Sequence, residues 1–93
     1  MDDAEKQWAH YRAQRGAILE DFGLKLAIRR GPEESQERLS ERALLHRNSV
    51  GLLERGEREP GLLTLLLLAK TFNITVNDLI AGLPVPTVKR PRA

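Results

Sequence analysis

The stretch from Ser35 to Gly56 is predicted to form two short helices joined by a tight turn, and no other part of the chain constrains the fold as much. The side chain of Ser35 can accept a hydrogen bond from a first-turn amide, which is typical of a helix N-cap. Gly56 can end the second helix, because glycine readily takes the left-handed conformation found just after a helix. The apolar residues between them recur mostly at the three- and four-residue steps of a buried helix face, which predicts a helix-turn-helix. They are Leu39, Ala43, Leu45, Val50 and Leu53.

The second of these helices is expected to begin near His46 or Arg47 and to present Arg47, Asn48 and Ser49 outward. Arginine pairs bidentately with guanine, asparagine with adenine, and serine with several base edges, all within a major groove that admits a helix. We therefore expect these three side chains to read bases of duplex DNA. The alternative is a solvated helix start without a ligand. Leu52 can either touch a thymine methyl group or pack beneath the backbone.

Composition leaves few other kinds of site open. Ninety-three residues suffice for one domain with a modest helical core. The chain has no cysteine, which excludes disulfides, thiolate zinc sites and a cysteine nucleophile, and it has only two histidines, so we expect no metal and no other cofactor. No set of nucleophile, base and paired carboxylates is recognisable, so an enzyme is not expected.

The first ten residues, MDDAEKQWAH, are acidic and polar, so no signal peptide is expected. No apolar run approaches the roughly 20 residues needed to cross a bilayer, and we expect a soluble cytoplasmic protein without membrane contact. The formal net charge of +2 is too small to indicate nucleic-acid binding by itself. The four aromatic residues argue against the stacking platforms that bind single strands or RNA, which leaves duplex DNA as the compatible nucleic acid.

Two helical patterns precede the central motif. Residues 3–20 place apolar residues at helical spacing, either in one helix or in a short helix that breaks near Gly16. Residues 18–30 form a denser apolar segment, which Gly31 and Pro32 are expected to end.

The patterns after the motif predict two more helices and a tail. Residues 62–72 carry more leucines than one core face needs, and Asn73 suits the end of that helix. Thr75 with Asp78 three residues later resembles a capping box that opens a last helix. The proline-rich, basic residues 84–93 are expected to be disordered. The surplus leucines must be covered either by the N-terminal helix or by a second copy of the chain; they are Leu63, Leu66 and Leu67.

Several short motifs occur in a fixed order along the chain: Ile28-Arg29, Ser35-Gln36-Glu37-x-Leu39, Val50-x-x-Leu53-Glu54-Arg55-Gly56, Pro60, Leu68-Ala69-Lys70 and Ile74-x-Val76-x-x-Leu79. With this order and spacing, the segment from about Phe22 to Gly82 resembles the lambda-repressor-like DNA-binding domain of the Cro/XRE regulator family. The resemblance implies an all-α, five-helix domain with an extra N-terminal helical segment. We expect an extension over 1–20, the DNA-binding domain over 21–83 and the tail over 84–93.

The resemblance also implies roles for individual residues. Arg29 and Glu54 match a family pair that forms a salt bridge between the first helix and the recognition helix. Leu44 stands where the family has glycine in the turn, and a leucine at positive φ costs about 1–2 kcal/mol. Glu34 replaces an apolar residue. The expected phosphate contacts are Gln36, Arg55, Arg58 and, near the start of the recognition helix, His46.

Together these features predict a transcriptional regulator that binds a short, two-fold symmetric operator as a homodimer, because one recognition helix buries little surface. Two further functions stay open. One is an antitoxin or controller-type regulator that also holds a partner protein, and the other is a helical adaptor that binds protein and not DNA.

Overall fold

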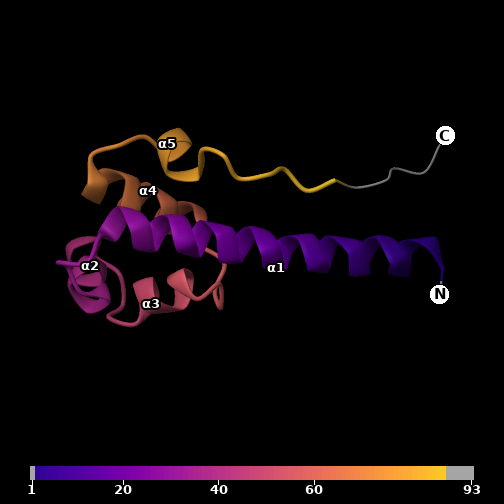
Figure 1. Ribbon diagram of the computed structural model, residues 1–93, viewed down its shortest axis with the longest axis horizontal. Helices are drawn as coiled ribbons and strands as arrows, with labels where there is room; N and C mark the ends of the chain where they lie inside the picture. The colour runs from indigo at the N-terminus through magenta and orange to yellow at the C-terminus, as the bar shows by residue number, and fades with distance from the viewer. Residues whose placement is uncertain (1, 88–93) are drawn as a thin grey trace.

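The structure is a computed structural model that describes residues 2–87, and over this range the chain folds into five α-helices without a strand. In Figure 1, the four shorter helices gather around the C-terminal half of the long first helix. This arrangement confirms the all-α, five-helix fold expected from the sequence. The helices are α1 (Asp3–Arg30), α2 (Gln36–Arg42), α3 (Ser49–Glu54), α4 (Leu62–Phe72) and α5 (Val76–Ile80).

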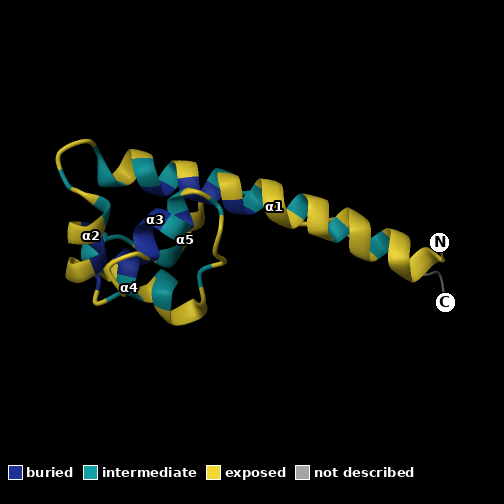
Figure 2. Cartoon of the chain, turned by 90° about the horizontal axis from the view of Figure 1, so that it is seen from below, coloured by how far each residue is buried: buried dark blue, intermediate teal, exposed yellow. Residues whose placement is uncertain are grey.

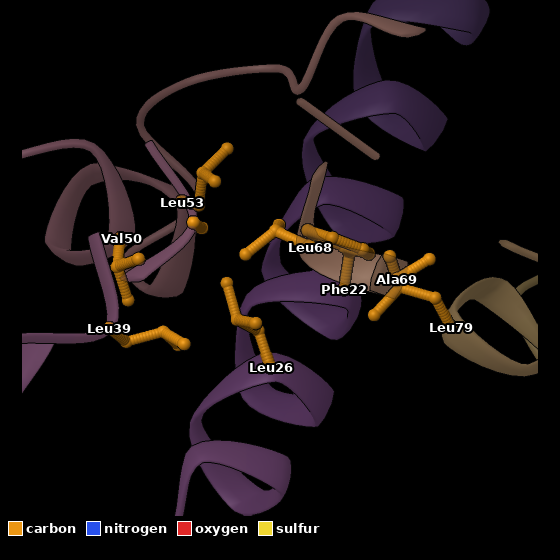
Figure 3. Packing of buried hydrophobic residues seen from close by; sticks show 9 residues of the cluster. Phe22, Leu26, Leu39, Val50, Leu53, Leu68, Ala69 and Leu79 are labelled. Atoms are coloured by element: carbon orange, nitrogen blue, oxygen red, sulfur yellow. The ribbon is translucent and has the colours of Figure 1, made fainter. Parts of the chain in front are cut away.

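The hydrophobic core draws side chains from all five helices, with α1 at its centre. Figure 3 shows Phe22 and Leu26 of α1 between two groups of apolar side chains, one from α2 and α3 and the other from α4 and α5. Full burial of a leucine contributes about 1.5–3 kcal/mol, so this cluster is the main source of stability. The two groups consist of Leu39, Val50 and Leu53 on one side, and Leu68, Ala69 and Leu79 on the other.

The helix ends follow the local sequence. Gly31 after α1 and Gly56 after α3 have φ values of 76° and 71°, and Asn73 after α4 has a φ of 56°. At the start of α5, Thr75 accepts a hydrogen bond from the Asp78 amide while the Asp78 carboxylate accepts one from the Thr75 amide. The expected stops and the capping box are therefore confirmed.

The N-terminal segment and the first helix of the domain are one continuous helix of 28 residues. Gly16 lies inside α1, which excludes a break at that position, and the expected boundary between residues 20 and 21 falls within the helix. No helix within residues 2–87, α1 included, is both long enough and apolar enough to span a membrane.

Part of the tail that was expected to be disordered lies beside α1 (Figure 1). The Gln14 amide nitrogen donates to the Thr87 carbonyl oxygen at 2.9 Å, and the Thr87 amide donates back to the Gln14 amide oxygen at 2.8 Å. The basic residues Lys89, Arg90 and Arg92 lie outside the described residues.

The surplus leucines of α4 are not covered by the N-terminal part of α1. Leu63 is 73% exposed, Leu66 is also exposed, and Leu67 is partly buried. Trp8 is itself 60% exposed. The first of the two covers expected from the sequence, the N-terminal helix, is therefore wrong for these leucines.

Candidate nucleic-acid interface

The turn between α2 and α3 contains the strained leucine expected from the sequence. Leu44 has a φ of 60°, and its side chain is 81% exposed. The Leu45 amide donates to the Ser40 carbonyl oxygen at 2.8 Å, which closes the C-terminal end of α2 around this residue. The turn therefore closes at the expense of backbone strain in a residue that gains almost no burial.

A buried serine hydroxyl joins the two helices of the motif. The Val50 amide donates to Ser40 Oγ at 3.1 Å, and Ser40 Oγ donates to the Gln36 carbonyl oxygen at 2.9 Å. The first amides of a helix have no partner within the helix, so Ser40 supplies one for α3 and fixes its start against α2. Sequence analysis did not single out Ser40, although a small polar residue next to Leu39 within an apolar helix face was a usable signal.

The recognition helix α3 begins at Ser49, so the expected start near His46 or Arg47 is too early. The Ser49 amide donates to the His46 carbonyl oxygen at 2.9 Å and the Asn48 amide to His46 Nδ1 at 3.3 Å, which makes residues 46–49 a turn. The first helical bond runs from Leu52 to Asn48 at 3.1 Å. Arg47 and Asn48 are both exposed and thus stand on the turn at the tip of α3.

Ser49 does not face outward, contrary to the expectation. It is only 8% exposed, because it lies four residues before Leu53 and so shares the inner face of α3 with that residue. A side chain buried in this way is not available to read a base. Leu52 is partly buried, which is compatible both with a thymine methyl contact and with packing beneath the backbone.

The salt bridge between α1 and α3 uses Arg30, and the expected partner Arg29 is wrong by one residue. Arg30 Nε lies 2.6 Å from Glu54 Oε2, and Arg30 Nη2 lies 3.0 Å from Glu54 Oε1. Arg30 follows the buried Leu26 by four residues and so faces α3, whereas Arg29 is turned by about 100°. The Arg29 guanidinium instead lies 5.9 Å from the centre of the Phe72 ring.

Glu54 binds a second side chain, because Gln36 Nε2 donates to its Oε1 at 2.8 Å. The hydrogen bond from Arg30 to this carboxylate raises the pKa of Arg30 above its ordinary value. The side chains of Arg30 and Glu54 are 17% and 6% exposed, so water screens their pair only weakly. This network ties α1, α2 and α3 together behind the exposed turn.

Gly23 lets α1 and α3 approach each other closely. A Cβ atom at this position would lie 2.5 Å from the Leu53 carbonyl oxygen and would also overlap the Glu54 carbonyl oxygen. Such contacts are too short for any side chain, so α3 can sit this close to α1 only if residue 23 is glycine. Sequence analysis missed this role.

Glu34, which replaces an apolar residue of the family pattern, binds Arg42 at the end of α2. Arg42 Nε lies 2.7 Å from Glu34 Oε2, and Arg42 Nη2 lies 2.9 Å from Glu34 Oε1. The hydrogen bond from Arg42 holds the pKa of Glu34 below its usual value. This bidentate pair fixes the loop before α2 to its last turn, where the family would use an apolar contact.

The expected phosphate-binding residues lie around the exposed turn and the loop after α3. His46, Arg55 and Arg58 are exposed, whereas the Gln36 side chain is held against Glu54. Arg55 Nε lies 2.8 Å from Glu57 Oε2 in a pair whose side chains are both 54% exposed. Exposed pairs of this kind contribute little, so Arg55 can exchange its carboxylate for a phosphate at small cost.

Comparisons with known proteins agree with this geometry. Residues 35–79 match the helix-turn-helix family model HTH_3. The control protein C.SmaI of Serratia marcescens is 48% identical over 46 residues, which is 50% of this chain and 55% of that protein. The crystal structure of the restriction-modification controller protein C.AhdI from Aeromonas hydrophila superimposes with a TM-score of 0.63 and 37% identity, covering 69% of this chain and 94% of C.AhdI. The chain therefore belongs to the Cro/XRE family of helix-turn-helix DNA-binding regulators, as its motifs indicated.

Proposed function

We propose that this regulator reads an operator through Arg47 and Asn48, which enter the major groove at the tip of α3. The observation that carries the proposal is that both side chains are exposed on a turn whose base is held rigidly by Ser40. Arginine and asparagine are the side chains best suited to bidentate contacts with guanine and adenine. Leu52 would add an apolar contact where the groove wall reaches α3.

The phosphate backbone would be held on both sides of this reading turn. Arg55 and Arg58 lie directly after α3, and His46 lies in the turn before it; all three are exposed. Gln36 would contribute through the start of α2, where unpaired amides and the helix dipole attract phosphate. These contacts would set the orientation of α3 without specifying sequence.

Operator binding would require two copies of the chain. A single reading turn buries too little surface for tight specific binding, and two copies about one helical turn of DNA apart satisfy a two-fold symmetric site. The exposed leucines of α4 are suited to this contact, because an apolar surface of this kind commonly marks a protein interface. A cytoplasmic homodimer is therefore the expected active form.

The similarity to two controller proteins favours a role in the control of restriction and modification genes. C.SmaI is described as a control protein and C.AhdI as a restriction-modification controller protein. By this similarity, the chain would control genes of a restriction-modification system, and a protein partner could act alongside the operator. A helical adaptor that binds only protein is the competing function.

Selection of bound sequences from random duplex DNA tests the proposal. We expect one enriched two-fold symmetric site, a dimer mass on that site, and an affinity that falls steeply as salt rises, because bound phosphates release counterions. Absence of any enriched sequence, together with binding that does not respond to salt, would support the adaptor and contradict DNA reading.

A further inference from the structure

The N-terminal part of α1 projects beyond the other helices as a separate rod (Figure 1). We call residues 3–14 the α1 arm; at 1.5 Å per residue it is about 18 Å long. Figure 2 shows that most of this rod is exposed. Trp8 and Tyr11 lie on it in an edge-to-face pair with ring centres 6.0 Å apart. The arm lies outside the segment matched by the family model, residues 35–79, so that match assigns it no role.

The face of α1 that lines the core continues along the arm. Leu26, Phe22 and Leu19 are buried, and further steps of three or four residues toward the N-terminus pass Arg15, which pairs with Glu59, and reach Tyr11 and Trp8. On the arm, no other helix covers this face within residues 2–87. The two aromatic side chains that continue the direction of the core face, Trp8 and Tyr11, thus have no helix packed on them within residues 2–87.

As far as residue 87, the C-terminal segment does not fill this place. Thr87 binds the arm at Gln14. Gln14 is six residues from Trp8 and therefore lies about a third of a turn away from it around the helix. Trp8 is 60% exposed.

The charged residues beside Trp8, Glu5 and Arg12, are placed so that the arms of two copies of the chain can complement each other. Glu5 precedes Trp8 by three residues and Arg12 follows it by four, so both lie on the same flank of the apolar face. Neither forms an ion pair within residues 2–87. When two such helices pack antiparallel about a two-fold axis near Trp8, Glu5 of each meets Arg12 of the other. In parallel packing the two copies would carry these residues on opposite sides of the interface, so Glu5 of one copy would not meet Arg12 of the other.

We propose that the α1 arm pairs antiparallel with the arm of a second copy of the chain. Trp8 packs against Trp8 of the partner subunit at the two-fold axis, and two reciprocal pairs of Glu5 with Arg12 of the partner subunit flank it. The contact is separate from the leucine surface of α4 and does not depend on DNA. It adds a second self-association site to the proposed operator-binding dimer.

Charge reversal on the arm tests this contact. Glu5→Arg and Arg12→Glu each replace two attractions by two repulsions, and we expect each to weaken self-association roughly tenfold. The double variant restores both attractions and should associate like the unchanged chain. An equimolar mixture of the two single variants should form mixed pairs, because all cross-pairs between them are attractive.

The measurements are sedimentation over a range of concentrations and the emission of Trp8, which is the only tryptophan of the chain. Lys6→Glu is the matched control, since it makes the same charge change as Arg12→Glu on the opposite side of the arm. Association should shift Trp8 emission to shorter wavelength in the unchanged chain and in Lys6→Glu. In Arg12→Glu the shift should require roughly tenfold higher concentration.

Two results would overturn the proposal. One is equal association of Arg12→Glu and Lys6→Glu, and the other is a double variant no better than the single ones. The binding of duplex DNA by the same proteins is measured separately. This distinguishes a chain that binds DNA without pairing through the arm from a chain that pairs through the arm without binding DNA.

Discussion

Replacement of Ser40 by alanine should destabilise the protein more than the small size of the removed hydroxyl group suggests. The hydroxyl is fully buried and is the acceptor for the Val50 amide at 3.1 Å, so Ser40→Ala leaves a buried donor without a partner. An unsatisfied buried donor costs about 1–3 kcal/mol. We expect a loss of about 2 kcal/mol, which in a domain of this size lowers the midpoint of thermal unfolding by roughly 10 °C.

Thr71→Ala provides the matched control, measured by thermal and denaturant unfolding followed by circular dichroism. Thr71 Oγ1 donates to the Leu67 carbonyl oxygen at 2.7 Å, but that carbonyl keeps its helical partner when the hydroxyl is removed. Thr71→Ala should therefore cost only about 0.5–1 kcal/mol. If Ser40→Ala costs no more than Thr71→Ala, the hydroxyl does not hold the start of α3 and the reasoning is refuted.

Three further substitutions test the frame around the site. Leu44→Gly should raise the free energy of unfolding by roughly 0.5–1 kcal/mol, because relief of about 1–2 kcal/mol of strain exceeds the entropy cost of glycine; a lower denaturation midpoint would contradict this. Gly23→Ala should cost about 1–3 kcal/mol in thermal unfolding by pushing α3 away from α1. Hydrogen bonds from the Thr75 amide and side chain lower the pKa of Asp78 below its ordinary value of 3.8. The resulting stability is present above that value and is lost as pH falls through the lowered pKa, so Asp78→Asn should flatten the free energy of unfolding against pH below about 4.

The helix ends could be predicted from sequence because local chemistry decides them. Gly31, Gly56 and Asn73 take the positive φ values that their positions require, and Thr75 with Asp78 forms the expected capping box. These features depend on residues close to one another in the chain. The order of the motifs likewise gave the family without knowledge of any contact.

The details of the site depended on how α3 packs, which local patterns do not reveal. On α1, a shift of one residue around the helix decides that Arg30 and not Arg29 reaches Glu54. On α3, the way the helix faces the core buries Ser49. The role of Ser40 exists only because α3 starts beside α2. The close approach at Gly23 depends on backbone atoms of a distant segment, so no pattern around Gly23 indicates it.

The most direct test of DNA reading is the affinity of Arg47→Ala for every single base-pair variant of the selected operator, with Arg55→Ala in parallel. Arg47→Ala should lose about 1–3 kcal/mol on the operator and lose base preference at one position of each half-site. Arg55→Ala should weaken binding to all sequences alike and reduce the salt dependence. An Arg47→Ala protein that keeps the affinity and the preferences of the unchanged chain would contradict the account.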